Sequence, residues 1–103
     1  MRPSRQGSSV PFVLPTAPKV TLVLQPNGYT ITWSATSEVG VVNWHCFLSP
    51  TPDGPYTDDP FRVRVDVHTY DLGGVTGYVW IQGEDDVATP VGPPSNRLYV
   101  NII

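Results

Sequence analysis

The chain has 103 residues, of which 40% are hydrophobic and 15% are charged. A length near 100 residues is typical of one domain and excludes a multidomain enzyme. The formal net charge of −3 excludes general nucleic-acid binding, which requires clustered lysine and arginine. One cysteine excludes an intrachain disulfide, and no apolar run reaches the length of about 18 residues that indicates membrane insertion.

Residues 1–17 differ in character from the rest of the chain. They contain three prolines and no acidic residue, so we expect an extended N-terminal arm with neither helix nor continuous strand. The arm has two interpretations, a tail without fixed structure or a docking element. In the second, Phe12 and Leu14 are apolar anchors, and Arg2 and Arg5 lie near an acidic surface of the partner.

Alternating apolar residues predict a series of short strands in residues 18–103. Residues 18–25 and 29–33 alternate with a period of two, which is typical of strands with one buried face. Asn27 and Gly28 lie between them and predict a hairpin turn, because both tolerate a positive φ. The same pattern predicts strands near residues 43–48, 61–68, 78–82 and 98–102. Strands at short intervals without a helical period indicate an antiparallel β-sandwich.

Two proline-rich segments interrupt the strand pattern. Residues 49–55 read SPTPDGP, which is typical of a turn. Residues 84–94 form a predicted loop, in which Pro90, Pro93 and Pro94 block any ladder of hydrogen bonds.

The predicted core collects the inward residues of the alternating pattern. In the strand near residues 78–82, alternation places Tyr78 and Trp80 inward, unless a bulge near Gly83 switches the inward face to Ile81. The predicted core residues are Val20, Leu22, Ile31, Trp33, Trp44, Cys46, Val63, Val65, Leu72, Tyr78, Leu98 and Val100.

Short motifs occur in a regular order along residues 18–103. They are Ala17-Pro18 before the first strand, Trp33 on the second, Trp44 and Cys46 on the third, Leu72 six residues before Tyr78, and Pro94-Ser95-Asn96 before the last strand. In this order and spacing the chain resembles a fibronectin type III domain. The resemblance implies a seven-stranded antiparallel β-sandwich of fibronectin type III or immunoglobulin-like type, with Tyr78 as a corner tyrosine that bonds nearby backbone. Gly73 departs from the family, which usually has a proline after the corner leucine.

The histidine, cysteine and acidic residues of the chain are not spaced as a catalytic site or a metal site requires. His45 and Cys46 are consecutive, so on a strand their side chains point to opposite faces. Glu84, Asp85 and Asp86 form the densest acidic cluster, which is either part of a calcium shell or an ordinary solvated loop. No EF-hand-like spacing accompanies these acids, so the solvated loop is the preferred interpretation. We therefore expect a protein that is not an enzyme and has no cofactor and no metal.

A small sandwich without a reactive cluster is expected to act as a surface that binds another protein or spaces an assembly. The resemblance implies the same, because fibronectin type III domains mainly mediate protein contacts or act as spacers, often through the loop between the last two strands. Here that loop is residues 84–94, and its prolines reduce the entropy lost on binding. Its predicted partner-binding residues are Glu84, Asp85, Asp86 and Thr89.

Three contexts remain open for such a module. The chain begins with its own Met1 and lacks a signal peptide, which favours an accessory or decoration protein of a phage capsid or tail, located in the virion and docked partly by its arm. The second context is a spacer or adhesion domain excised from a longer extracellular protein. The third is a carbohydrate-binding module, with Trp80 and either Phe47 or Tyr56 as the aromatic platform.

Overall fold

The computed structural model describes residues 15–26 and 28–102, and every helix or strand in these residues is a β-strand. The strands are β1 (Lys19–Gln25), β2 (Gly28–Ser34), β3 (Asn43–Ser49), β4 (Asp58–Arg64), β5 (Thr69–Leu72), β6 (Thr76–Glu84), β7 (Pro90–Val91) and β8 (Leu98–Asn101). The predicted all-β class is confirmed.

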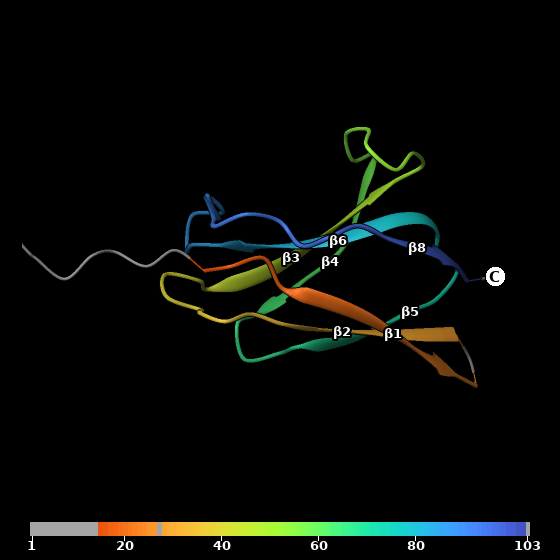
Figure 1. Ribbon diagram of the computed structural model, residues 1–103, viewed down its shortest axis with the longest axis horizontal. Coiled ribbons are helices and arrows are strands. Elements are labelled where there is room, and N and C mark those ends of the chain that lie inside the picture. The colour runs from red at the N-terminus through yellow and green to blue at the C-terminus, as the bar shows by residue number, and fades with distance from the viewer. Residues whose placement is uncertain (1–14, 27, 103) are drawn as a thin grey trace, which may run out of the picture.

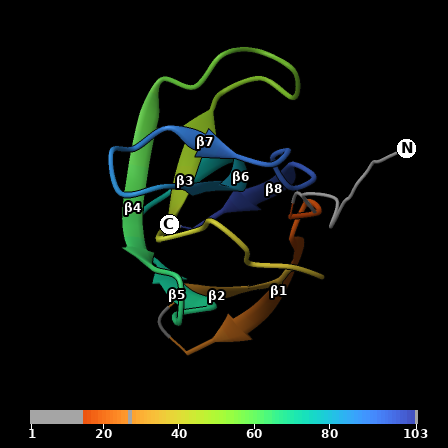
Figure 2. The same ribbon diagram turned by 90° about the vertical axis from the view of Figure 1, so that its left-hand side faces the viewer.

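The strands form two antiparallel sheets that face each other. One has three strands in the order β1-β2-β5, and the other has five, in which β4-β3-β6 run side by side and both β7 and β8 pair with β6. Figures 1 and 2 show the two layers, with β1, β2 and β5 opposite β3, β6 and β8. The arrangement is sandwich-like, and the core lies between the layers.

The β1–β2 hairpin builds the first sheet. Its register pairs Leu22 with Ile31 and Gln25 with Gly28. Gly28 has a φ of +136°, which residues with side chains rarely adopt, and a Cβ there would lie 3.0 Å from the carbonyl oxygen of Leu72. Glycine therefore allows the chain to turn close to β5. Asn27, the other residue of the predicted turn, lies outside the described residues.

Large side chains from both sheets close the space between the layers. Trp44 and Cys46 on β3 and Val79 and Ile81 on β6 are almost completely buried. Burial of an aliphatic side chain such as Val79 or Ile81 stabilises the fold by roughly 1.5–3 kcal/mol through removal of apolar surface from water. Near β4, the ring of Phe61 stacks on Trp33 of the facing sheet at 5.7 Å between centroids.

The inward residues of β6 are not the ones that the alternation of Tyr78 and Trp80 predicts. Val79 and Ile81 point into the core, whereas Tyr78 lies on the outer face beside Tyr99, with ring centroids 5.2 Å apart. The register between β3 and β6 is continuous from Asn43 to Ser49, so no bulge near Gly83 causes the change. Tyr78 is therefore not a core residue.

Most of the other predicted core residues lie between the sheets. Leu22, Val63, Val65 and Leu98 are only partly buried and pack against the core from its margin. Val65 follows the end of β4, which is shorter than the predicted strand of residues 61–68. The fully enclosed members of the predicted set are Val20, Ile31, Trp33, Trp44, Cys46, Leu72 and Val100.

The described residues contain eight strands in place of the seven expected. Pro90 and Val91 form the short strand β7, which pairs with Glu84 and Gly83 at the end of β6. The prediction that residues 84–94 form a loop without strand pairing is therefore wrong for Glu84, Pro90 and Val91. A proline is compatible with pairing here because β7 lies at the edge of the sheet, where its missing N–H does not interrupt a second ladder.

The two outer faces of the sheets carry different side chains. The outer face of the three-stranded sheet, here called the threonine face, includes Thr21, Val23, Thr30, Thr32, Thr69 and Asp71. Its hydroxyl groups bond one another, as between Thr21 and Thr32 at 2.7 Å, and Thr30 bonds Asp71. The outer face of the five-stranded sheet is aromatic and charged.

Candidate functional site

Three aromatic side chains from different segments converge on the outer face of the five-stranded sheet. Phe47 on β3 stacks on Trp80 of β6 with centroids 5.6 Å apart. Tyr56, in the connection between β3 and β4, lies 4.8 Å from Phe47 at an interplanar angle of 57°. Phe47 and Trp80 are cross-strand neighbours in the register, which brings their rings together.

Arg97 contacts both Trp80 and the segment that carries Tyr56. Its guanidinium carbon lies 3.7 Å from the centroid of the Trp80 ring, a cation–π contact. The same side chain donates a hydrogen bond of 2.7 Å to the carbonyl oxygen of Gly54. Because Gly54 precedes Tyr56 by two residues, Arg97 ties the segment that carries Tyr56 to the sheet.

Four ionisable side chains, here called the charge cluster, lie beside the aromatic rings: His45, Asp59, Arg62 and Glu84. Arg62 Nε donates to Glu84 Oε1 at 2.8 Å, and His45 Nδ1 lies 2.6 Å from Glu84 Oε2. His45 Nε2 lies 3.1 Å from Asp59 Oδ2. The side chains of His45 and Glu84 are 8% and 6% exposed, so their partners replace the water that burial removes.

Donors and acceptors face one another in the charge cluster. A carboxylate oxygen of Glu84 lies 2.6 Å from His45 Nδ1 and accepts a hydrogen bond from that nitrogen when it is protonated. Arg62 Nη2 lies 3.1 Å from the same nitrogen. The hydrogen bond with Glu84 raises the pKa of the Arg62 guanidinium, with the negative charges of Glu84 and Asp59 acting in the same direction and desolvation opposing them.

Together these residues surround an open groove of about 420 Å³, within the roughly 300–1,000 Å³ typical of small-ligand sites. We call it the aromatic groove. Tyr56 lies on one side and Ala88 and Pro90, from the connection after β6, also line it. The full lining is His45, Phe47, Tyr56, Arg62, Trp80, Gln82, Glu84, Ala88 and Pro90.

The predicted acidic loop residues do not act as one exposed cluster. Glu84 is 5% exposed and belongs to the end of β6, so the expectation of a solvated residue is wrong for it. Asp85 Oδ1 accepts hydrogen bonds from the backbone N–H groups of Val87 and Thr89, which caps the tight turn at the end of β6. Asp86 and Thr89 are exposed at this turn.

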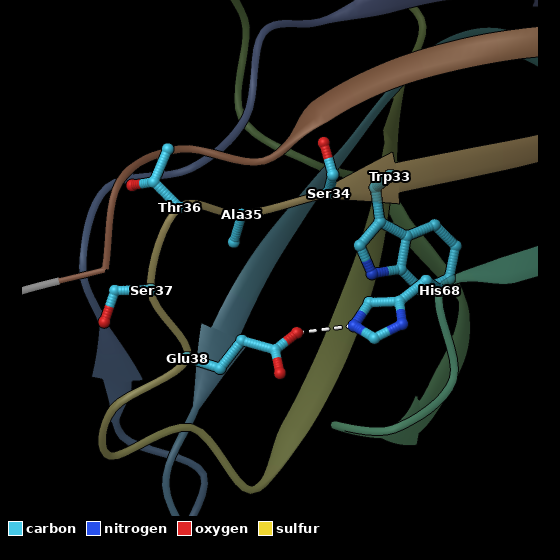
Figure 3. A pocket seen from close by; sticks show the side chains of 7 residues that line it. All are labelled: Trp33, Ser34, Ala35, Thr36, Ser37, Glu38 and His68. Carbon is cyan, nitrogen blue, oxygen red and sulfur yellow. Dashed lines mark hydrogen bonds and ion pairs between the residues drawn. The ribbon is translucent and has the colours of Figure 1, made fainter.

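A second depression lies beside the end of β2 and is shown in Figure 3. His68 Nε2 and Glu38 Oε2 form an exposed pair 2.5 Å apart on its border. Trp33 lines the depression, and its buried Nε1 has no hydrogen-bond partner among the residues that the structure describes. The remaining lining is Ser34, Ala35, Thr36 and Ser37.

In the described part of the chain, neither histidine is hydrogen-bonded to a serine, threonine or cysteine side chain. Cys46 is fully buried in the core, and desolvation raises the pKa of its thiol from 9.0 to about 12. A thiol with this pKa is almost entirely protonated at neutral pH and is a poor nucleophile. His45 belongs to the charge cluster, on the opposite face of β3 from Cys46, and His68 is paired with Glu38. In residues 15–26 and 28–102, no three His, Cys, Asp or Glu side chains group to hold a metal ion.

The predicted docking residues of the arm, Arg2, Arg5, Phe12 and Leu14, lie outside the described residues. Of the arm, the structure describes residues 15–17, where Pro15 is buried and a Cβ on Gly92 would lie 2.6 Å from its carbonyl oxygen. No helix in the described residues has the length and hydropathy needed to cross a membrane.

The sequence matches no protein-family model and no curated protein sequence. Among solved structures, the chain is similar to pectate lyase PelI from Erwinia chrysanthemi, determined in complex with tetragalacturonic acid. The TM-score is 0.62 at 16% sequence identity, and the match covers 81% of this chain and 28% of that chain. At this identity the likeness shows the fold alone, an all-β and sandwich-like domain.

Sequence reasoning found some parts of the aromatic groove and missed others. Trp80, Phe47 and Tyr56 are the aromatic residues of the carbohydrate interpretation, and the structure brings all three together. Trp80 is only 8% exposed and Arg97 covers its ring, so Phe47 and Tyr56 supply the accessible aromatic surface. The roles of His45 and Arg62 were missed, and their alternation with core residues on neighbouring strands was the signal that they share an outer face.

Proposed function

We propose that this chain is a non-catalytic binding module with a fibronectin type III-like β-sandwich, and that the aromatic groove is its binding surface. The observation that carries the proposal is the convergence of Phe47, Tyr56 and Trp80 on a side of the sheet that faces solvent. The sandwich core does not require aromatic residues there, and concave sites lined by aromatic side chains with a few fixed polar groups are typical of ligand binding.

The strand connectivity supports the fibronectin type III-like assignment. β5 follows β4 in the chain but pairs with β2 in the opposite sheet. Such crossing between sheets is typical of Greek-key sandwiches in the immunoglobulin-like class. The motif Pro94-Ser95-Asn96 connects β7 to β8, where buried Ser95 exchanges hydrogen bonds with the backbone of Ile81.

The absence of an activated nucleophile among the described residues supports a non-catalytic role. The Cys46 thiol is buried, with a pKa of about 12, and both ring nitrogens of His45 face carboxylates that hold the ring in place. These groups stabilise a rigid surface and are poorly placed to attack a substrate.

The wider setting remains a prediction. A component of a phage capsid or tail would bind a protein subunit through the arm and the turn after β6, where Asp86 and Thr89 are exposed. A domain of a longer extracellular protein would use the same turn as an adhesion surface. Both settings are compatible with binding through the aromatic groove, since Ala88 and Pro90 border both features.

The test is capture of macromolecules from an extract of the cells that express the chain. The immobilised chain is compared with two variants. Tyr56→Ala removes an exposed side chain of the aromatic groove, and Thr32→Ala removes a half-buried side chain from the threonine face. We expect the captured set to disappear with Tyr56→Ala and to persist with Thr32→Ala. Equal capture by both variants, or loss only with Thr32→Ala, contradicts the proposal.

A further inference from the structure

We infer that the ligand of the aromatic groove is a neutral oligosaccharide built of pyranose rings, an inference that rests on the proposed function. Phe47 and Tyr56 provide the surface on which one sugar ring packs, and Arg62 and Gln82 provide hydrogen bonds to its hydroxyl groups. The inference follows from the shape of the aromatic pair, from its polar partners and from the pairing of charged side chains at the groove.

The aromatic pair forms an angled surface for a flat, partly apolar ring. Tyr56 and Phe47 meet at 57° with their centroids 4.8 Å apart, and Tyr56 is 53% exposed. One face of a pyranose carries mainly C–H groups, which are attracted to the negative face of an aromatic ring. Tyrosine has few rotatable bonds, so it loses little conformational entropy when a ligand packs on it.

Polar groups at the groove offer both donors and acceptors, as sugar hydroxyl groups require. Arg62 uses Nε and Nη2 within the charge cluster, and its Nη1 has no partner among the described residues. Gln82 donates from Nε2 to the carbonyl oxygen of Gly92, which fixes the side-chain amide, while Oε1 has no donor in the described part of the chain. Arg62 therefore supplies donors and Gln82 an acceptor, both on side chains that are already oriented.

This pairing favours a saccharide over a proline-rich peptide. A polyproline segment also packs on aromatic grooves, but it exposes carbonyl oxygens and lacks backbone N–H groups. Such a segment has no backbone N–H to donate to Gln82 Oε1, whereas a sugar hydroxyl both donates and accepts.

The charges around the groove favour a neutral sugar over an acidic one. Arg62 and Arg97 are the nearby arginines, and within the charge cluster Arg62 bonds the carboxylate of Glu84. Arg62 lines the groove but is already paired with Glu84, so it is not a free cation for the carboxylates of a uronic acid polymer. A neutral chain of sugars avoids the desolvation of an unpaired carboxylate.

The experiment uses the full chain with a fluorescent label on a printed array. The spots are neutral oligosaccharides, uronic acid oligosaccharides and a decaproline peptide. Titration calorimetry then measures the affinity for the strongest neutral spot. We expect Tyr56→Ala to weaken binding at least about tenfold. The matched control is Tyr99→Ala, which removes a tyrosine of similar exposure, 52%, from the same outer face outside the groove. We expect the control to bind within about twofold of the unmodified chain.

Each other outcome overturns a defined part of the account. Binding to no neutral spot, or binding to uronic acid spots alone, overturns the neutral saccharide. Binding to decaproline that is lost with Tyr56→Ala overturns the saccharide but leaves the aromatic groove as the binding surface. Binding that is unchanged by Tyr56→Ala, with thermal unfolding showing both variants folded, overturns the groove and the proposed function together.

Discussion

The two outer faces of this domain differ in the side chains that cover them and in how deeply those side chains are buried. The threonine face covers the three-stranded sheet with short side chains, and hydroxyl groups such as those of Thr21 and Thr32 bond one another. The outer face of the five-stranded sheet buries Trp80 and Glu84 to 8% and 5% exposure beneath neighbouring side chains such as those of Arg97 and Arg62.

The difference shows that the five-stranded sheet carries a second, smaller packed region outside the sandwich core. Antiparallel sheets commonly have one solvated face, and the threonine face follows that pattern. On the opposite side of the molecule, Phe47 and Arg97 both pack on Trp80, and Phe47 also contacts His45 of the charge cluster. A surface that is ordered in this way presents its exposed groups in one geometry, as a binding site requires.

The largest loss of stability is expected for Trp80→Ala, which tests whether Trp80 is packed on the outer face. Trp80→Ala removes a buried indole together with its contacts to Phe47 and Arg97. We expect a loss of about 3–4 kcal/mol in the free energy of unfolding, measured by urea denaturation. Thr32→Ala on the threonine face is the control, with an expected loss of about 0.5 kcal/mol. Equal losses would remove the contrast between the faces.

The charge cluster gives the next prediction. Glu84→Ala leaves His45 and Arg62 without their shared carboxylate on the outer face, and we expect a loss of about 3 kcal/mol in stability. Asp71→Ala removes a carboxylate from the threonine face, where it bonds Thr30, and we expect a loss of about 1 kcal/mol. Urea denaturation at neutral pH measures both. A smaller loss for Glu84→Ala than for Asp71→Ala would contradict the description of the charge cluster.

Cys46 provides a pH-dependent test that β3 separates the core from the outer face. Burial raises the pKa of this thiol from 9.0 to about 12, so the folded chain holds the proton more tightly than the unfolded chain. The resulting stability is present below pH 9 and is lost as the pH rises toward 12. Between these limits we expect a decrease of about 1.4 kcal/mol per pH unit that Cys46→Ala removes.

Urea denaturation from pH 9 to 11 measures this slope for both proteins. The core cavity that Cys46→Ala creates lowers stability at every pH and does not alter the comparison of slopes. A slope that is the same in both would show that the thiol is not held in the core.

The smallest change in stability is expected for Tyr56→Ala, which separates a loss of binding from a loss of folding. Tyr56 is 53% exposed, so Tyr56→Ala is expected to change the free energy of unfolding by less than about 0.5 kcal/mol. A larger loss would mean that Tyr56 is a packing residue like Trp80, and its effect on capture would then report folding.

Alternation predicts the inward side chains wherever one face of a strand is polar. In β2, Ile31 and Trp33 are inward and alternate with threonines, so the phase is readable from the sequence. In β6, Tyr78 to Ile81 are all large and apolar, and the period alone does not distinguish the two faces. The facing sheet determines the phase, because Val79 and Ile81 fill the core and Trp80 packs on Phe47.

The aromatic groove depends on register and on loop direction, which local patterns do not contain. Glu84 meets His45 because Asn43 pairs with Glu84 across β3 and β6, residues that lie far apart in the chain. In the sequence, Glu84 stands beside two aspartates and resembles a solvated loop. Turn residues around Gly54 predict that the chain bends, but only the contact from Arg97 shows that the bend carries Tyr56 over the sheet.

The most direct test of the central claim is amide chemical-shift mapping by NMR. The labelled chain is titrated with a mixture of neutral hexasaccharides of glucose, mannose and N-acetylglucosamine. We expect shifts confined to the surroundings of Phe47, Tyr56 and Gln82, with the amides of Thr21, Thr32 and Thr69 unchanged. Saturating shifts centred on the threonine face, or no shift at any residue of the aromatic groove, would contradict this claim.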